Sequence, residues 1–258
     1  MHLIGIQTSL VKQDSDLAET ILDSIKAQKL NIDSGDVLAV ASKVVATVQG
    51  QVKKLDEVKL SKRARELAGE YALEPNFVEI VLQEADQVYG GVQKALLTLK
   101  DRILTANAGV DHKNTPKGYA VTWPSEPFKT AEELGKKIFE ITGKTVGVII
   151  VDSRVTPLRL GTTGLALAAA GFEPVKDHRG EIDLYGNAIA ITRHAVADDL
   201  ASAAHLLMGE AGEQTPFVLI KGAPVKPMDR VEPSSLIISP EQCLYTKYVL
   251  KGAAKERL

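Results

Sequence analysis

Three segments of the sequence carry oxygen-bearing side chains of the kind that bind divalent metal ions. Asp111 lies in a polar stretch after a predicted strand, and Asp152 follows a strongly apolar stretch with the hydroxyl of Ser153 beside it. Glu210 lies in an acidic loop that also contains glycine. Mg²⁺ and Mn²⁺ prefer such ligands and keep positions for water and phosphate oxygens, as a nucleoside triphosphate site requires. Taken singly, each carboxylate is more typical of a solvated loop than of a metal site.

Other polar side chains lie where a nucleotide or an acid could bind. Ser42 and Lys43 end an apolar run and could reach a phosphate, and Asn114 could hydrogen-bond a base or a ribose. His178 and Arg179 could meet an anionic substrate, although their polar segment could equally be an exposed hairpin. Each of these side chains could also be an exposed group without a ligand.

The common short catalytic motifs mostly fail. Residues 143–145 imitate the end of a phosphate-binding loop, but Ile138 stands where the first glycine is needed, which favours a turn. Residues 152–156 resemble the nucleophile strand of haloacid-dehalogenase phosphatases, but Arg154 replaces the second carboxylate, so a phosphatase is a minor alternative. Because Cys243 is the single cysteine, intrachain disulfides and zinc sites built from several thiolates are excluded.

The composition is that of a globular chain large enough to bury a substantial core. The 258 residues are 45% hydrophobic, and 31 Lys and Arg nearly balance 33 Asp and Glu, which predicts no nucleic-acid partner. The longest apolar stretches, residues 146–151 and 165–170, fall far short of the roughly 18 residues of a membrane span. The N-terminus has no secretory signal pattern, so we expect no membrane partner and a cytoplasmic location.

Helical and strand patterns alternate along the chain and favour a mixed α and β architecture. Asp16 is expected to cap a first helix, and Thr130 with Glu133 predicts a capping box for a helix ending near Gly143. Asp152 is expected at the carboxyl end of a strand, where ligands of open α/β sheets bind. Further helices are predicted over Ser61–Tyr71, Pro75–Ala85 and His194–Met208, and strands over Asp36–Ser42, Arg102–Ala106, Thr145–Val151 and Phe217–Ile220. No linker is readable, so residues 1–258 are expected to form a single unit or two intimately packed lobes.

An ordered series of segments resembles the coenzyme F420-0 γ-glutamyl ligases. The resemblance spans roughly residues 4–222 and is far more specific than any one short motif. The matching segments are residues 35–43, 107–111 with Asn114, 148–153, 183–186, 195–201 and 207–210.

The resemblance implies an activity, a fold and a set of site residues. Members of that family attach L-glutamate to a carboxylate, using GTP and a divalent metal, and form an intertwined homodimer with an α+β fold of mixed sheets and flanking helices. The implied metal ligands, for two Mg²⁺ or Mn²⁺ ions, are Asp111, Asp152, Ser153 and Glu210. The implied residues for GTP or ATP are Thr8, Ser9, Leu10, Val11, Ser42, Lys43, Asn114, Gly209 and Gly212. Asp111, Asp152 and Arg159 would serve the reaction, in which the acceptor acid becomes an acyl phosphate before the amine attacks.

Two departures from the family pattern fall beside this site. Ala46-Thr47 replaces a frequent Ser-Lys pair, and Val155-Thr156 replaces a common Gly-Arg pair. The first change removes a cation expected near the nucleotide phosphates, and the second can alter which acid is recognised. The acceptor could therefore be F420-0 or a folate-type acid such as dihydropteroate, or the chain could be a non-catalytic relative that binds a nucleotide.

Overall fold

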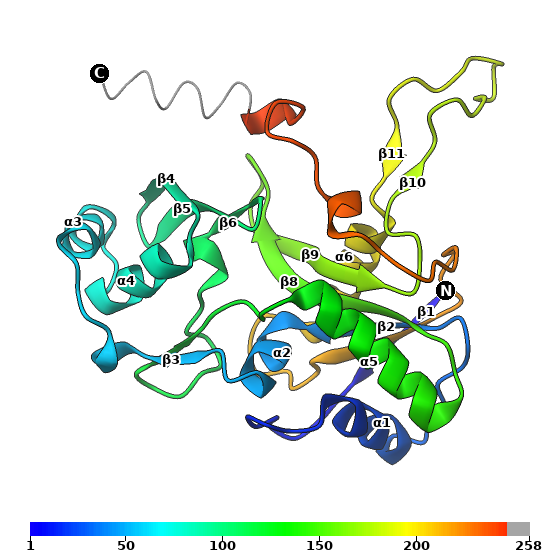
Figure 1. Cartoon of the computed structure of the whole chain (residues 1–258), viewed down its shortest axis with the longest axis horizontal. Helices are drawn as coiled ribbons and strands as arrows, with labels where there is room; N and C mark the ends of the chain where they lie inside the picture. The colour runs from blue at the N-terminus through cyan, green and yellow to red at the C-terminus, as the bar shows by residue number, and fades with distance from the viewer. Residues whose placement is uncertain (247–258) are drawn as a thin grey trace. The chain divides into compact units, whose positions relative to one another are not determined.

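The computed structural model describes residues 1–246 and divides the chain into two compact units (Figure 1). Unit 1 comprises Met1–Gly50 and Pro124–Leu236, and unit 2 comprises Gln51–Trp123 with the described residues from Ile237 on. Unit 2 is thus inserted into unit 1. The predicted α+β class with several sheets is confirmed, whereas the grouping of residues 1–258 as one domain stays a prediction.

In each unit, a hydrogen bond joins the two chain segments that flank the insertion point. In unit 1, the side-chain Oε1 of Gln49 accepts a hydrogen bond from the backbone N–H of Ser125 at 2.8 Å. In unit 2, the backbone N–H of Thr122 donates to the carbonyl of Gln51 at 3.0 Å. Each unit therefore joins its own two chain segments at the insertion point by a hydrogen bond within that unit.

Unit 1 is built on a five-stranded sheet in the order β1-β12-β2-β8-β9. Its strands are β1 (His2–Ile6), β2 (Val37–Ala41), β8 (Gly147–Val155), β9 (Thr162–Ala170) and β12 (Phe217–Lys221). β2 and β8 are parallel, and the other neighbours are antiparallel. The central strands are buried on both faces, which is why they read as unbroken apolar runs.

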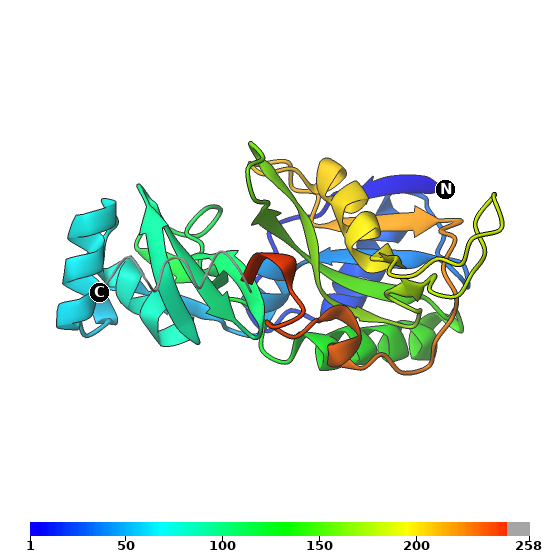
Figure 2. The ribbon, with the colours of Figure 1, turned by 90° about the horizontal axis from the view of Figure 1, so that it is seen from above.

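Helices cover both faces of this sheet (Figure 2). α6 (Val196–Met208) lies on one face, and α5 (Pro127–Thr142) lies on the other together with α1 (Leu17–Ala27). The short α2 (Ser42–Val48) follows β2 directly. α6 approaches β9 closely at Gly164, where a Cβ would lie 2.3 Å from the carbonyl oxygen of Ala201.

Several predicted boundaries are confirmed and others are wrong. Asp16 caps α1 by accepting from the backbone N–H of Glu19 at 3.2 Å, and α5 ends at Gly143 in the left-handed conformation. The capping box at Thr130 is wrong, because α5 begins at Pro127 and the Thr130 hydroxyl donates to the Glu126 carbonyl inside the first turn. His194 belongs to the short strand β11 (Arg193–His194), which pairs with β10 (Lys176–Asp177), and not to α6.

Unit 2 packs two helices against small antiparallel sheets. α3 (Lys62–Tyr71) and α4 (Pro75–Glu84) confirm the predicted helices, and they share a core with Leu96 and Ala108. One sheet contains β4 (Gln87–Val92), β5 (Ala95–Lys100) and β6 (Ile103–Ala106), and the other pairs β3 (Val52–Lys54) with β7 (Tyr119–Val121). Three short 3-10 turns complete the described chain at Leu55–Glu57, Asn107–Gly109 and Pro233–Leu236.

Residues 176–194 form an arm that projects from unit 1 (Figure 1, upper right). The carboxylate of Asp183 accepts hydrogen bonds from the backbone N–H groups of Tyr185 and Asn187, both at 2.8 Å, so the tip has a defined turn. Leu184 and Tyr185 at this tip are almost fully exposed. The arm confirms the hairpin alternative and presents apolar side chains to solvent.

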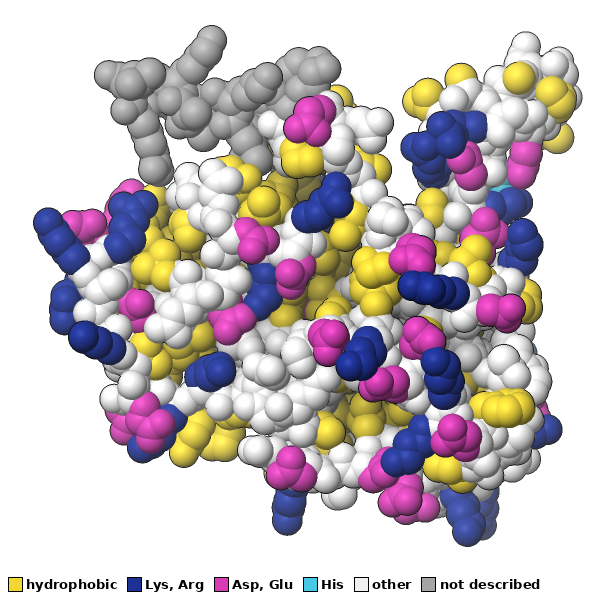
Figure 3. Space-filling model, in the orientation of Figure 1, with side chains coloured by type: hydrophobic (Ala, Val, Ile, Leu, Met, Phe, Trp, Pro, Cys, Tyr) yellow, Lys and Arg dark blue, Asp and Glu magenta, His cyan; other side chains and the backbone are white. Residues whose placement is uncertain are grey.

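The surface in Figure 3 carries interspersed basic and acidic side chains over the face shown. No helix among residues 1–246 is long and apolar enough to cross a membrane. The cytoplasmic location stays a prediction.

Candidate functional site

One end of the unit 1 sheet brings together most of the predicted site residues. Because β2 and β8 are parallel, Ala41 lies beside Val151, and Ser42 and Asp152 follow them at the same end. β12 runs antiparallel to both β2 and β1, so Phe217 begins there and Ile6 ends there. We call this end of the sheet, formed by Ile6, Ala41, Val151 and Phe217, the site end.

Two loops predicted to hold a nucleotide meet at the site end. Residues 8–11 leave β1 there, and residues 209–214 lead into β12 there. The backbone N–H of Thr8 donates to the carbonyl of Gln214 at 3.2 Å and joins the two loops. The fold therefore gathers the following predicted nucleotide residues in unit 1: Thr8, Ser9, Leu10, Val11, Ser42, Lys43, Gly209 and Gly212.

Asp152 is half-buried within β8, and its predicted position at the end of the strand is wrong. β8 continues to Val155 because β9 pairs with it, with Asp152 opposite Leu165. Asp152 nevertheless lies at the point where the neighbouring strand β2 has ended. Its Oδ1 accepts a hydrogen bond from the backbone N–H of Ser153 at 2.8 Å, which fixes one oxygen of the carboxylate.

The Glu210 carboxylate is held by two side chains that sequence reasoning missed. Its Oε1 lies 2.6 Å from the hydroxyl of Thr162 at the start of β9 and 2.9 Å from Nε2 of His205 in the last turn of α6. Thr162 gives no local signal, because it lies 48 residues from Glu210 in the chain. These two donors orient the carboxylate beside the end of β8, since Thr162 pairs with Val155.

The two glycines of the 209–214 loop differ in whether a side chain could replace them. Gly209 has a φ of 71°, and a Cβ there would lie 2.2 Å from Cδ of Glu213. The Glu213 carboxylate is itself held by the backbone N–H of Ala211 at 2.8 Å. At Gly212 a Cβ would meet open space. The loop geometry therefore depends on the first glycine alone.

Asp111 and Asn114 belong to unit 2 and follow a strained turn. Asn107, Ala108 and Gly109 are three successive left-handed residues, with φ of 52°, 51° and 71°. Side chains of β5 and of the turn itself stabilise it, because Thr98 Oγ1 accepts from the N–H of Ala108 at 2.7 Å. Asn107 Oδ1 likewise accepts from the N–H of Leu96 at 2.8 Å. The strain thus occurs directly before a predicted metal ligand, as is common at functional sites.

The backbone of Asp111 is fixed by β7. Its N–H donates to the carbonyl of Val121 at 2.9 Å, and its carbonyl accepts from the Val121 N–H at 2.8 Å. Its Oδ1 accepts from the N–H of Lys113 at 2.8 Å. Asp111 and Asn114 are described within unit 2, so their joining the residues of the site end stays a prediction.

The remaining candidates are placed as follows. Arg159 lies on the exposed loop between β8 and β9, where its N–H donates to the carbonyl of Thr156. The Thr47 hydroxyl donates to the carbonyl of Lys43 at 2.8 Å, so it serves its own helix. Arg179, considered for an anionic substrate, instead pairs with Asp177 through its Nε at 2.8 Å and holds the pKa of that carboxyl well below its usual range.

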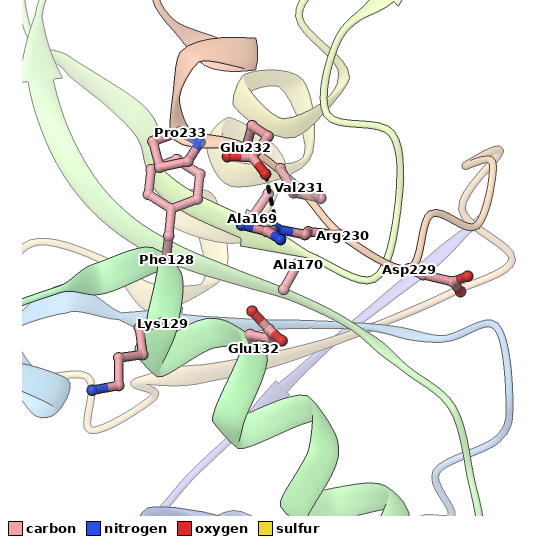
Figure 4. Close-up of a pocket in the computed structure, with 10 residues that line it drawn as sticks. All are labelled: Phe128, Lys129, Glu132, Ala169, Ala170, Asp229, Arg230, Val231, Glu232 and Pro233. Atoms are coloured by element: carbon pink, nitrogen blue, oxygen red, sulfur yellow. Dashed lines mark ion pairs between the residues drawn. The ribbon is translucent and has the colours of Figure 1, made fainter.

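No group of three or more His, Cys, Asp and Glu side chains within residues 1–246 is arranged to hold a metal ion. A cavity of about 140 Å³ lies away from the site end, beside Ala169 and Ala170 at the other end of β9. Figure 4 shows Arg230 and Glu232 paired above it and Glu132 of α5 below. No predicted site residue lines this cavity.

Comparison with known proteins identifies the family. Residues 5–222 match the family described as F420-0:Gamma-glutamyl ligase. The chain is 40% identical over 213 residues to the coenzyme F420:L-glutamate ligase of Methanopyrus kandleri, covering 82% of each chain. It is 37% identical to the enzyme of the same name from Archaeoglobus fulgidus, covering 83% of this chain and 84% of that one. The chain is therefore an enzyme that belongs to the F420-0:gamma-glutamyl ligase family.

Proposed function

We propose that the protein joins L-glutamate to the carboxylate of F420-0 through an amide bond, driven by GTP or ATP and a divalent metal ion. The observation that carries the proposal is the site end, where two adjoining loops, Asp152 and an oriented Glu210 occur together in unit 1. The names of relatives at 35% to 40% identity support the same reaction.

Asp152, Ser153 and Glu210, with Asp111 of unit 2, are the residues proposed to hold two Mg²⁺ or Mn²⁺ ions. The donors fit such ions in kind, because all are oxygens and the Glu210 carboxylate is already oriented by Thr162. Mg²⁺ commonly takes one or two carboxylates and completes its shell with water and phosphate oxygens, so it does not need three clustered side chains.

The proposed reaction has two steps. A carboxylate is a poor electrophile, so the terminal phosphoryl group of the nucleotide is first transferred to the acceptor acid, giving an acyl phosphate and a nucleoside diphosphate. The amine of glutamate then attacks the carbonyl carbon, which forms the amide and releases phosphate. Asp152, Ser153, Glu210 and Asp111 would hold the metal ions, which would supply positive charge to neutralise the phosphates. Arg159 is proposed to stabilise the charge of the acid substrate.

The residues proposed to bind the nucleotide are assigned from their positions in the fold. The backbone N–H of Thr8 donates to Gln214 of the loop that contains Gly209 and Gly212, and Ser9, Leu10 and Val11 follow Thr8 in the chain. Ser42, Lys43 and Asn114 complete the set. A folate-type acceptor is the second candidate, because Val155-Thr156 stands where a Gly-Arg pair is common, and loss of that arginine can alter which acid is recognised. Thr47 stands where a lysine is frequent, and its hydroxyl is bound within α2. Loss of that lysine favours weaker triphosphate binding or a change of nucleotide, with the same chemistry.

We also infer a homodimer in which the arm contacts a second copy. Leu184 and Tyr185 are almost fully exposed, although hydrogen bonds fix the turn that presents them. Light scattering after gel filtration should give twice the chain mass, and Leu184→Ser with Tyr185→Ser should shift it toward the monomer. A monomeric parent chain would refute the dimer.

The test of the proposed function is mass spectrometry of products. The protein is incubated with glutamate, MnCl₂ and GTP or ATP, with F420-0 and dihydropteroate offered in separate reactions. Glutamate added to F420-0 is the expected result, and addition to dihydropteroate alone would select the second candidate. Phosphate release without glutamate or acceptor would instead indicate a phosphatase.

Asp152→Asn is the matched variant for this test. It removes the charge and keeps the shape, so product should fall below detection. Asp23→Asn, on the exposed surface of α1, is the control for the same chemical change. Full activity of Asp152→Asn would refute the metal assignment.

A further inference from the structure

Arg154 lies among the proposed site residues but has no role in the scheme above. It follows Asp152 by two positions in β8, and its backbone pairs with Thr163 of β9. The next residue of β9 toward the hairpin, Thr162, donates to Glu210. The Arg154 backbone therefore lies between Asp152 and Thr162, the residue that binds the Glu210 carboxylate.

The guanidinium of Arg154 lacks a close hydrogen-bond acceptor among the residues that the structure describes. Its closest acidic atom is Oδ2 of Asp198, 3.6 Å from Nη2, which is too long for a hydrogen bond. Asp198 Oδ1 already accepts from the backbone N–H of Ala166 at 2.9 Å. The Nε of Arg154 is buried and has no hydrogen-bond partner among the residues that the structure describes. A buried donor without an acceptor is costly, so such a group calls for an explanation.

Arg179 provides a comparison, because its guanidinium forms a close ion pair with a carboxylate of the same chain. Its Nε lies 2.8 Å and 3.0 Å from the two oxygens of Asp177, and its Nη2 lies 2.5 Å from Oδ2. Arg154 makes none of these contacts with Asp198. About a third of the Arg154 side chain, 37%, is exposed, so an anion can reach the guanidinium from solvent.

We propose that Arg154 is a substrate-binding residue, whose guanidinium donates hydrogen bonds to a carboxylate or phosphate oxygen of a substrate bound at the site end. The inference rests on the proposed function, because it takes the site end as the place where substrates bind. A planar guanidinium can donate two parallel N–H groups to one oxyanion, which suits both chemistries. The oxyanion belongs to glutamate, to the acceptor acid or to the nucleotide, and the experiment separates these sources.

The experiment compares Arg154→Gln and Arg154→Lys with the parent protein. The KM of each substrate is measured in turn, with thermal unfolding of each variant as the check on folding. Arg154→Gln should raise one KM by about 10- to 100-fold, and the affected substrate identifies the source of the oxyanion. Arg154→Lys should recover part of the loss, because it keeps the charge and loses the two-pronged geometry.

Asp198→Asn is the control for a purely structural role. Asparagine keeps an oxygen that can accept from the Ala166 N–H and removes the charge facing Arg154. If Arg154 only links β8 to α6, Arg154→Gln and Asp198→Asn should lower the melting temperature alike and leave every KM unchanged, which would overturn the proposal. An increase in KM confined to the Arg154 variants supports it.

Failure of the proposed function leads to a different outcome. If the parent protein forms no product with either acceptor, calorimetric titration with glutamate and with GTP and MnCl₂ replaces the KM values. Weaker binding of either ligand by Arg154→Gln then supports the role of Arg154 without the ligase reaction. Equal binding by parent and variant, or no binding by the parent, overturns it.

Discussion

The two aspartates proposed to bind metal, Asp152 and Asp111, differ in the local structure that positions them. Asp152 lies in a regular strand, and its position follows from the register of β8 with β2 and β9. Asp111 follows three left-handed residues, two of which carry side chains, and such residues cost about 1–2 kcal/mol each. Strand register therefore positions the first carboxylate, whereas the second depends on side-chain hydrogen bonds that stabilise a strained turn as well as on backbone pairing with Val121. Different substitutions should break each one.

Gly109→Ala should have the largest effect on stability. A Cβ at Gly109 would lie 2.0 Å from Nε1 of the buried Trp123, and φ is 71°, so we expect a loss of about 3 kcal/mol in the free energy of unfolding. Gly118→Ala is the matched control, because its φ of 86° is also left-handed but a Cβ would meet open space. Urea denaturation measures both. Equal losses would show that contact with the indole is not what requires glycine.

Gly209→Ala should weaken nucleotide binding more than it affects folding. The φ of 71° with ψ of −175° suits only glycine, and the new Cβ would displace the side chain of Glu213. We expect about a tenfold higher Kd for GTP, measured by calorimetric titration. Adding Glu213→Ala removes the collision and leaves the backbone strain. Complete rescue by the double variant would mean that the backbone strain has no part in the effect.

Glu79→Gln should give the smallest effect, confined to unit 2 and dependent on pH. Hydrogen bonds from the Ser61 side chain and backbone N–H lower the pKa of Glu79 below its ordinary 4.5. A lowered pKa stabilises the folded state above pH 4.5, and this contribution is lost as the pH falls through the folded-state pKa. The stability difference between parent and variant should therefore shrink from pH 6 to pH 3. A difference that stays constant would contradict the linkage.

The sequence predicted best where the signal is local. Asp16 and Gly143 mark the ends of their helices because a cap depends on a few neighbouring residues. The capping box at Thr130 failed because Pro127 starts the helix earlier, at a position where its missing N–H costs nothing.

Features that depend on distant partners could not be predicted from the sequence. β8 is longer than its apolar run because β9 supplies hydrogen bonds to the polar residues after Val151. Thr162 reaches Glu210 from a strand 48 residues earlier. The carboxylates of the candidate site were indicated by residue type and by the family resemblance, whereas the side chains that orient them were not.

The position of β12 has a consequence for how the chain is made. β1 and β2 are not neighbours in the sheet, because β12, which starts at Phe217, fills the space between them. During synthesis, the edges of β1 and β2 that face β12 therefore stay unpaired until residues 217–221 have left the ribosome. Unit 2 closes between Gln51 and Thr122 and can complete its own pairing long before that. Truncation just before Phe217 should therefore still allow the strands within residues 51–123 to pair, inside an aggregation-prone host.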